Sequence, residues 1–322
     1  MKNRLPGILF LSAVFAGVVS GSALAQESPK VRVGFFPNIT HAQAMVGQAD
    51  GEFDQAFGAG TLEWTSFNAG PSVIEAMFAG HLDIAYIGPS PAVNGYLKSG
   101  GDALKIVAGA AAGGAALVVR DDVKIQSPSD FHQKKIASPQ FGNTQDVALR
   151  SWLASQNLKL REKGGDVDVL PLANADQLTL FMKKEIDASW SVEPWVSIFL
   201  KKGGAHVYLE ESSLWADGKY ATTVVIVRKK FLEEHPDLVK KFVDTNARIT
   251  DWINAHPDDA KTLLNQQFEK VMHKKIDPDI LNAAWKRVQF TTDPMKASVT
   301  AQAENAYKVG FLKKKPDLKG LF

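Results

Sequence analysis

The sequence predicts an α/β fold of two similar lobes, each a βαβαβ unit, joined by two hinge crossings. From Val31 onward, short apolar runs of strand length alternate with amphipathic segments of helix length, as in a parallel sheet covered by helices. The same order begins again at Lys135. The β-branched run TTVVIVR at 222–228 then restores the strand pattern and is expected to return the chain to the first lobe.

The first pass along the chain contains five predicted strands and three predicted helices. A turn at Pro37-Asn38-Ile39-Thr40 follows the first strand and supplies possible helix caps. The strands are expected at 31–36, 62–67, 84–87, 105–110 and 115–120, and the helices at 42–50, from Gly70 and from Gly88.

The second pass repeats this plan with strands at 135–137, 167–170 and 186–192 and helices at 144–156 and 175–184. One constant offset aligns the two passes without a gap, placing Thr40 on Thr144 and Leu82 on Ile186. The aligned positions share apolar spacing more than identity. We therefore expect two lobes built on one plan.

Residues 30–119 and 222–322 are predicted to form lobe 1, and residues 120–221 lobe 2, with crossings at 118–120 and 221–223. Helices are expected at 229–255, 258–270, 277–288 and 297–309, interrupted at His235-Pro236 and His256-Pro257 because proline breaks a helix. Open α/β sheets bind ligands at the carboxyl ends of their strands. Two facing lobes therefore predict one cleft between them.

Residues 1–25 have the features of a cleaved secretory signal peptide. Lys2 and Arg4 form a basic start, an apolar segment at 8–19 follows, and Ala23-Leu24-Ala25 is a small-x-small cleavage motif. The apolar segment is shorter than the roughly 20 residues that a membrane-spanning helix needs. The absence of cysteine excludes disulfides, thiol nucleophiles and thiolate metal sites. The expected location is the periplasm.

The charge of the mature chain is expected to be balanced. Without Lys2 and Arg4, the 37 basic residues become 35, equal to the 35 acidic residues. A balanced charge gives no electrostatic support for binding nucleic acid or an anionic membrane surface.

The stretch from Asn68 to Pro91, NAGPSVIEAMFAGHLDIAYIGPSP, contains two predicted strand-to-helix turns. A helix start presents unpaired backbone N–H groups and the positive end of the helix dipole, and glycine lets a ligand approach the backbone. Ordinary turns need the same residue types, so both interpretations stay open. The candidate ligand-binding residues in these turns are Gly70, Pro71, Ser72, Gly88 and Ser90.

The second lobe offers neutral donors at a facing helix start and aromatic residues at a strand end. Gln140, Asn143, Thr144 and Gln145 are the neutral donors, although Thr144 can instead be an N-cap. In the segment WSVEPW at 190–195, the indoles of Trp190 and Trp195 are candidate walls and Glu193 a candidate acceptor. The alternative is that the tryptophans belong to the core and Glu193 is a helix-start carboxylate.

The sequence contains no recognisable metal, cofactor or hydrolase motif. None of the seven histidines has metal-ligand spacing, and no GxSxG elbow, P-loop or dinucleotide fingerprint occurs. We therefore expect no cofactor and no bound metal. His41, after Thr40 at a predicted helix start, is the histidine expected to face the cleft, with a solvated or capping role as the alternative.

Four segments resemble the nitrate/sulfonate/taurine group of periplasmic solute-binding proteins: AGPSVIEAMFAGHLDIAYIG, SPQFGNTQDVALRSWLASQNL, ADQLTLFMKKEIDASWSVEPW and VVIVRKKFLEEHPDLVKKF. The resemblance spans Val31 to the C-terminus. It implies the two-lobed type II periplasmic binding protein fold and a receptor, usually monomeric, that closes about a hinge. Such a receptor presents a small anion to the inner-membrane permease of an ABC importer.

The resemblance also implies a site in which helix-start amides and hydroxyls of both lobes hold the anionic head. The matching positions are Asn38-Ile39-Thr40, Gly70-Pro71-Ser72, Gly88-Pro89-Ser90 and Gly142-Asn143-Thr144, with Trp190, Glu193 and Trp195 as a side wall. The segment PNITH at 37–41 departs from the more Gly/Ser-like turn of the sulfonate receptors, which leaves the solute open.

We therefore expect a binding protein, not an enzyme, for an aliphatic sulfonate or taurine-like anion. Nitrate or bicarbonate is one alternative, and a pyrimidine- or flavin-like heterocycle stacked on Trp190 or Trp195 is another. An enzyme of the same fold would need a nucleophile or an acid/base pair, for which His41 and Glu193 are the available candidates.

Overall fold

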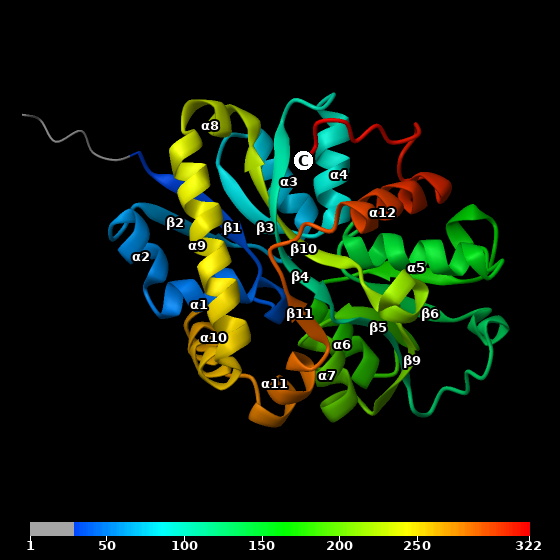
Figure 1. Ribbon diagram of the computed structural model, residues 1–322. Helices are drawn as coiled ribbons and strands as arrows, with labels where there is room; N and C mark the ends of the chain where they lie inside the picture. Colours follow the sequence, from blue (N-terminus) through cyan, green and yellow to red (C-terminus); the bar gives the residue numbers. More distant parts are fainter. Residues whose placement is uncertain (1–28) are drawn as a thin grey trace, which may run out of the picture.

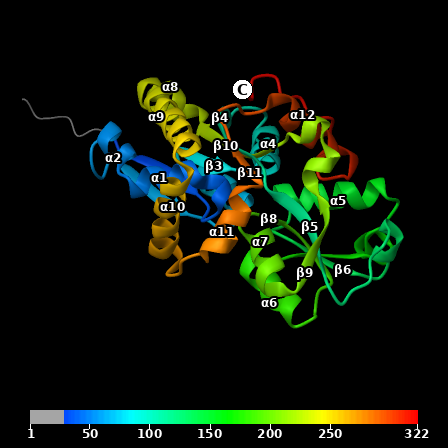
Figure 2. The ribbon, with the colours of Figure 1, turned by 60° about the horizontal axis from the view of Figure 1, so that its bottom comes forward.

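The computed structural model describes residues 29–322 and shows two sheets with helices around them (Figures 1 and 2). The predicted signal peptide lies outside the described residues. The strand order is β11-β4-β10-β3-β1-β2 in the six-stranded sheet and β7-β6-β8-β5-β9 in the five-stranded sheet. The predicted two-lobed α/β fold is confirmed. We call the six-stranded sheet with its helices lobe 1 and the five-stranded sheet with its helices lobe 2.

The strands of each sheet come from distant parts of the chain. Lobe 1 contains β1 (Val31–Phe35), β2 (Leu62–Ser66), β3 (Ile84–Ile87), β4 (Leu104–Gly113), β10 (Ala221–Arg228) and β11 (Val288–Phe290). Lobe 2 contains β5 (Ala115–Arg120), β6 (Lys135–Ser138), β7 (Asp168–Pro171), β8 (Ala188–Val192) and β9 (Ala205–Glu210).

Both sheets are mixed, whereas the sequence predicts parallel ones. The pairs of β1 with β2 and β3, and of β6 with β7 and β8, are parallel, as a βαβ unit requires. Strand β10 runs antiparallel to β3 and β4, and β5 runs antiparallel to β8 and β9. The antiparallel strands flank the points where the chain changes lobe, because a strand that enters from the other sheet needs no helical crossover.

The first crossing between the sheets occurs at Gly113-Gly114, not at the predicted residues 118–120. Residues 118–120 belong to β5, and all of β5 pairs within lobe 2. Both glycines have positive φ, 74° and 80°, and a Cβ on Gly113 would lie 2.9 Å from the carbonyl oxygen of Arg287. Only glycine adopts this turn without strain. The second crossing ends where β10 begins at Ala221, within the predicted 221–223.

The helices cover both faces of each sheet (Figure 1). Lobe 1 carries α1 (Ala42–Ala49), α2 (Glu52–Phe57), α3 (Gly70–Phe78), α4 (Pro89–Lys98), α8 (Lys229–Glu234), α9 (Pro236–Ala255), α10 (Pro257–Met272), α11 (Pro278–Trp285) and α12 (Lys296–Lys308). Lobe 2 carries α5 (Thr144–Ser155), α6 (Asn174–Met182) and α7 (Trp195–Ile198). As predicted, Pro236 and Pro257 each begin a new helix.

Two apolar clusters sandwich the six-stranded sheet. On β3, Ile84 and Tyr86 join the cluster under α1, α9 and α10, while Ala85 and Ile87 join the one under α3, α4 and α12. This alternation is the period of a strand buried on both faces. It holds the end of β3, and so the start of α4, in a fixed position.

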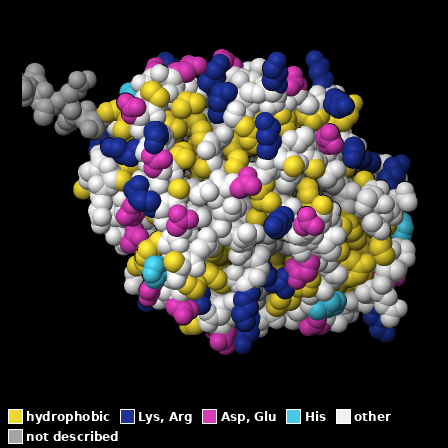
Figure 3. All heavy atoms as spheres, viewed as in Figure 1, with side chains coloured by type: hydrophobic (Ala, Val, Ile, Leu, Met, Phe, Trp, Pro, Cys, Tyr) yellow, Lys and Arg dark blue, Asp and Glu magenta, His cyan; other side chains and the backbone are white. Residues whose placement is uncertain are grey.

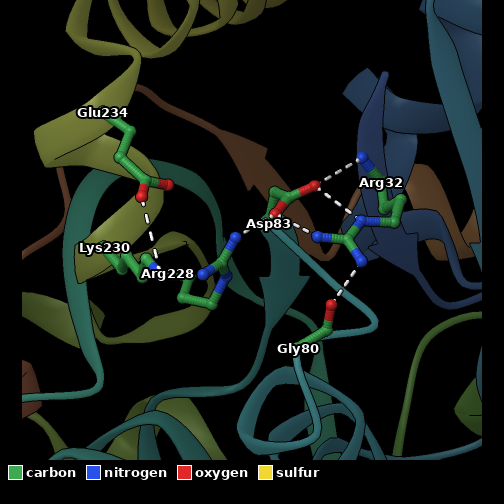
Figure 4. A network of polar contacts seen from close by, with 6 residues as sticks. All are labelled: Arg32, Gly80, Asp83, Arg228, Lys230 and Glu234. Atoms are coloured by element: carbon green, nitrogen blue, oxygen red, sulfur yellow. Dashed lines mark hydrogen bonds and ion pairs between the residues drawn. The ribbon is translucent and has the colours of Figure 1, made fainter. Parts of the chain in front are cut away.

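Asp83 ties three strands of lobe 1 together at the edge of the sheet where β1 and β3 begin and β10 ends (Figure 4). Its buried carboxylate accepts hydrogen bonds from the backbone and side chain of Arg32, which precedes Val33 in β1, and from Arg228 Nη2 at 2.7 Å in β10. Burial alone raises the pKa of Asp83, but the hydrogen bonds from both arginines outweigh it and lower the pKa. The aspartate of the GHLDIA segment is therefore structural.

The surface of the described part of the chain shows mixed charge. Lysine and arginine side chains alternate with aspartate and glutamate over the face seen in Figure 3. Within residues 29–322, no helix combines the length and apolar character needed to cross a bilayer.

Candidate functional site: a polar cavity between the lobes

A small cavity of about 20 Å³ lies where the two lobes meet. Its lining follows the carboxyl ends of β1, β2 and β3 in lobe 1 and of β6, β7 and β8 in lobe 2, which is where α/β sheets bind ligands. The lining residues are Phe36, Asn38, Thr40, His41, Asn68, Gly88, Pro139, Asn143, Gln145, Asn174, Val192, Thr222 and Thr223.

Four helices of eight or more residues begin at this cavity, two from each lobe. Asn68 lies just before α3, Gly88 is the N-cap of α4, Asn143 is the N-cap of α5, and Asn174 is the first residue of α6. No N-cap side chain of these four helices makes a capping hydrogen bond. The amide of Asn143 is therefore free to face the cavity, together with the N–H groups of the helix starts.

The lobes touch directly where α4 meets α5. The backbone N–H of Ser90 donates to Thr144 Oγ1 at 3.3 Å, and a Cβ on Gly88 would lie 2.2 Å from the same oxygen. Pro89 and Pro91 have no N–H, so Ser90 is the one residue among the first three of α4 that can donate a backbone hydrogen bond. The buried Ser90 hydroxyl has no hydrogen-bond partner within the described residues. This junction therefore combines a direct contact between the lobes with a buried hydroxyl that lacks a partner in the described part of the chain.

His41 is buried and neutral. Its Nδ1 accepts a hydrogen bond from the backbone N–H of Phe36 at 3.2 Å, and its ring lies 4.4 Å from the ring of Phe36. Burial lowers the pKa of His41 to about 3. A neutral ring whose Nδ1 is an acceptor carries its proton on Nε2. His41 is therefore a neutral N–H donor in the cavity lining.

The cavity lining contains amide, hydroxyl and imidazole groups and no charged side chain. Helix starts and neutral donors stabilise a small anion by hydrogen bonds and by the helix dipoles without a fixed counter-charge. Among residues 29–322, no group of three or more His, Asp or Glu side chains is arranged to hold a metal ion. The arrangement suits recognition of a small polar or anionic group.

The model of the NMT1-like family matches residues 24–265, three quarters of the chain. The chain belongs to this family. The resemblance to the nitrate/sulfonate/taurine group is confirmed, since relatives of this NMT1-like protein are named as taurine-binding and aliphatic sulfonates-binding proteins. It is 29% identical over 235 residues to the taurine-binding periplasmic protein of Escherichia coli (strain K12), covering 73% of this chain and 70% of that one.

Two further comparisons cover nearly the whole chain. A protein of Bacillus subtilis (strain 168) whose name describes it as aliphatic sulfonates-binding is 25% identical over 324 residues. The match covers 98% of this chain and 92% of that one. The alkanesulfonate-binding protein from Xanthomonas axonopodis pv. citri, whose structure is bound to MOPS, superposes with a TM-score of 0.75 at 20% identity. That superposition covers 91% of this chain and 97% of the other, and shows the shared fold.

Six of the residues predicted from sequence line the cavity of this NMT1-like protein: Asn38, Thr40, His41, Gly88, Asn143 and Gln145. Ser90 and Thr144 form the adjacent contact between the lobes. These eight positions come from both lobes, as the prediction of a shared cleft requires.

The predicted residues Gly70, Pro71, Ser72 and Gln140 also lie outside the cavity lining. Ser72 Oγ donates to Gln140 Oε1 at 3.4 Å, so this pair bridges the lobes. A Cβ on Gly70 would lie 2.2 Å from Pro91 Cγ, so this glycine permits close packing of α3 on α4, and Pro71 is the second residue of α3. Ser72 and Gln140 therefore form a contact between the lobes, while Gly70 and Pro71 shape the turn.

The predicted side wall is wrong for Trp190 and Glu193. Trp190 is fully buried in the core of lobe 2, where its Nε1–H donates to Glu211 Oε2 at 2.7 Å. Glu193 is also fully buried and accepts hydrogen bonds from the backbone N–H of Ser197 at 3.0 Å and from its hydroxyl at 2.9 Å. Both therefore follow the alternative of core and helix-start roles.

Glu193 joins the two lobes at a different place from the cavity. Its Oε1 lies 3.3 Å from Nε of Arg287, which also pairs with Glu210. Burial raises the pKa of Glu193 to about 7, while hydrogen bonds from Ser197 and the charge of Arg287 oppose the rise. Trp195 is partly exposed and lines a second, apolar pocket described below.

Sequence reasoning missed Asn68, Asn174, Thr222 and Thr223. The offset that aligns the two passes places Gly70 on Asn174, so the internal repeat contained the signal for Asn174. The two threonines are the second and third residues of β10, and Thr222 Oγ1 donates to the carbonyl oxygen of Gly113 at 2.6 Å in the first crossing. Their place at the hinge follows from the sheet topology, which the strand pattern alone does not give.

Proposed function

We propose that this protein is the periplasmic solute-binding component of an ABC importer. It would capture a small anion, best an aliphatic sulfonate or a taurine-like compound, in the cavity between the lobes and deliver it to an inner-membrane permease. The names of the relatives support the sulfonate class, and the predicted signal peptide supports the location. Nitrate or bicarbonate is the second candidate, because neither needs more than neutral donors.

One observation carries the proposal: neutral donors and four helix starts from two lobes converge on one cavity without a charged side chain in its lining. A monoanion gains hydrogen bonds and dipole stabilisation there. An arginine or lysine in the cavity would hold the anion more tightly and slow its release, which an importer must allow. Neutral recognition is therefore consistent with capture followed by transfer.

Contacts between the lobes supply a route from binding to closure. The Ser90–Thr144 and Ser72–Gln140 hydrogen bonds exist only when the lobes are together. A ligand shifts the equilibrium toward the closed form only through contacts that the closed form alone makes. An anion that bonds to α3 or α4 and also to Asn143 satisfies this condition.

We propose a binding role and not an enzymatic one. His41 is the only titratable side chain among the residues that line the cavity, and Glu193, the suggested acid/base partner, is buried against Ser197 and Arg287 instead. General acid–base catalysis needs the two groups within reach of one substrate.

Isothermal titration calorimetry of the chain from Gln26 to Phe322 tests this proposal. The panel contains methanesulfonate, butanesulfonate, taurine, nitrate, bicarbonate and sulfate. Saturable binding of a sulfonate with a stoichiometry of one is the expected result. Binding of nitrate or bicarbonate alone would support the second candidate, and no heat with any of these anions would contradict the anion-receptor proposal.

A further inference from the structure

An apolar pocket of about 310 Å³ lies beside the polar cavity, between the same two lobes. Its walls come from α6 and α7 of lobe 2 and from α10, α11 and the loop between them in lobe 1, and Figure 2 shows α7 next to α11. The lining residues are Pro37, Ala175, Leu178, Pro194, Trp195, Ile198, Lys202, Met272, Lys274, Lys275, Ile276, Asp277 and Ile280.

The apolar pocket and the polar cavity adjoin along three chain segments. Residues 36–38, 174–175 and 192–194 each contribute to the lining of both. These segments are the end of β1, the start of α6 and the end of β8. A molecule held by the helix start at Asn174 is therefore one residue away from the apolar wall that begins at Ala175.

We propose that the solute is an anion with an apolar tail, whose head occupies the polar cavity and whose aromatic or alkyl tail occupies the apolar pocket. This inference rests on the proposed function, because it specifies the ligand of the same receptor. It favours aryl- and longer-chain alkanesulfonates over small sulfonates.

The sizes of the two spaces fit this division. About 20 Å³ is room for one or two groups of the size of a water molecule, so the polar cavity has no space for a tail in addition to a head group. A cavity of about 150 Å³ holds benzene. The apolar pocket, at about 310 Å³, therefore has room for one or two rings or for a branched chain.

The chemistry of the apolar pocket disfavours a second charge on the tail. Leu178, Trp195, Ile198, Ile276 and Ile280 present hydrocarbon and an indole ring to this space. An ammonium group buried against such a wall loses its hydration without gaining a partner. Taurine, which carries an ammonium on its short chain, is therefore a poorer fit than an uncharged tail.

The mouth of the apolar pocket carries Lys202, Lys274 and Lys275 against one acidic residue, Asp277. All four are exposed, and Lys275 also pairs with Glu269 at 3.1 Å. An excess of exposed positive charge at an entrance raises the local concentration of an anion and speeds its capture. The charge at the mouth matches an anionic head, while the interior matches an apolar tail.

Calorimetry with a chain-length series of sulfonates tests the inference on the unmodified chain. The series is methane-, butane-, hexane- and octanesulfonate, with benzenesulfonate and naphthalenesulfonate as ring compounds. The dissociation constant is expected to fall about fourfold for each methylene that enters the pocket, and taurine is expected to bind more weakly than butanesulfonate.

A pocket-filling variant links the tail effect to this place. Ala175→Trp puts a ring into the pocket from an exposed position of α6, and Ala154→Trp is the matched control at an exposed alanine of α5. Ala175→Trp is expected to weaken octanesulfonate at least tenfold and to leave methanesulfonate within twofold. Ala154→Trp is expected to change neither. Thermal unfolding of both variants checks that each is folded.

Two results would overturn the inference, and they are distinguishable. If all sulfonates bind with one affinity whatever their tail, or if Ala175→Trp leaves the chain-length effect intact, the tail does not occupy this pocket and the receptor proposal stands. If no sulfonate of any length binds, the proposed function itself fails and this inference fails with it.

Discussion

Gly88→Ala is expected to hinder closure of the lobes while leaving lobe 1 intact. Gly88 has φ −69° and ψ 151°, which any residue adopts without strain. An added Cβ would lie 2.2 Å from Oγ1 and 3.2 Å from Cβ of Thr144 in lobe 2. Within its own lobe, the added Cβ would meet the carbonyl oxygen of Thr222 at 3.7 Å, an ordinary contact. The substitution therefore acts across the lobes.

The expected loss of affinity follows from the contacts that the clash would break. Relieving it requires the lobes to part by about 1 Å, since non-bonded atoms rest at about 3.5 Å. The Ser90–Thr144 hydrogen bond at 3.3 Å and the Ser72–Gln140 hydrogen bond at 3.4 Å would then be lost. Both are long, so together they contribute about 1–2 kcal/mol to the closed form. The apparent affinity should fall about 5- to 30-fold.

Calorimetry with the tightest-binding sulfonate measures this loss, and small-angle X-ray scattering with saturating ligand measures the radius of gyration. Gly203→Ala is the matched control, because its Cβ would meet Phe199 and Phe181 of the same lobe at 3.4 Å and 3.5 Å. Wild-type affinity together with full compaction in Gly88→Ala would refute the reasoning, since the Gly88–Thr144 contact would then not limit closure.

Three further predictions concern stability and protonation. Asp83→Asn should lower the free energy of unfolding at pH 7 by about 1–3 kcal/mol in urea titrations, with exposed Asp102→Asn as the control. The pKa of Asp83 is lowered in the fold, so the stability difference between wild type and variant is present above the unfolded pKa of about 4. It should shrink as the pH falls through the folded pKa. A gap that persists in acid would contradict that assignment. Burial raises the pKa of Glu211 to about 7, so the stability that its protonated form contributes is fully present below about pH 4.5 and is lost as the pH rises toward 7. Between pH 5 and 8 the free energy of unfolding of the wild type should therefore fall by about 1–3 kcal/mol more than that of Glu211→Gln. An equal pH dependence of the two proteins would disprove this prediction. Since the pKa of His41 is about 3, nitrogen NMR should show its imidazole neutral, with the proton on Nε2, down to pH 5; protonation near pH 6.5 would contradict its burial.

The sequence predicts most of the helix starts because each lies where two strong local signals coincide. The run at 84–87 is apolar and short, and Gly88 with Pro89 follows it, so both β3 and the start of α4 are predicted within one residue. Thr144, predicted as a helix start, is the first residue of α5. Turn residues next to a short apolar run fix an element boundary locally, without tertiary information.

The side chains of β8 show what a local pattern gives and what it does not. Ala188, Trp190 and Val192 alternate with Ser189 and Ser191, so the period of a strand places Trp190 on one face and both serines on the other. Trp190 points into the core of lobe 2, while Ser189 and Ser191 hydrogen-bond to each other at 2.7 Å. All five residues are buried, because the tertiary fold covers both faces, and the alternation alone does not say whether core or cleft covers the tryptophan.

The internal repeat carries more information than apolar spacing alone. Asp83 in lobe 1 accepts a hydrogen bond from the backbone N–H of Arg32 at the start of the sheet, and Asp187 in lobe 2 accepts one from the backbone N–H of Lys135 at 2.9 Å. The repeated aspartates therefore have a repeated structural role. Their equivalence could be predicted from the offset, but the hydrogen bonds could not, because they join strands distant in sequence.

Calorimetry of Asn143→Ala tests the central claim, that neutral donors at helix starts of both lobes hold an anion between them. The Asn143 side chain makes no capping hydrogen bond, so its loss should cost the fold little. A hydrogen bond to a charged group contributes about 1.5–3 kcal/mol, so the variant should bind the best sulfonate about 10- to 150-fold more weakly. Gln156→Ala, at the exposed end of the same helix, should bind like the wild type. Unchanged affinity in a folded Asn143→Ala protein would contradict the account.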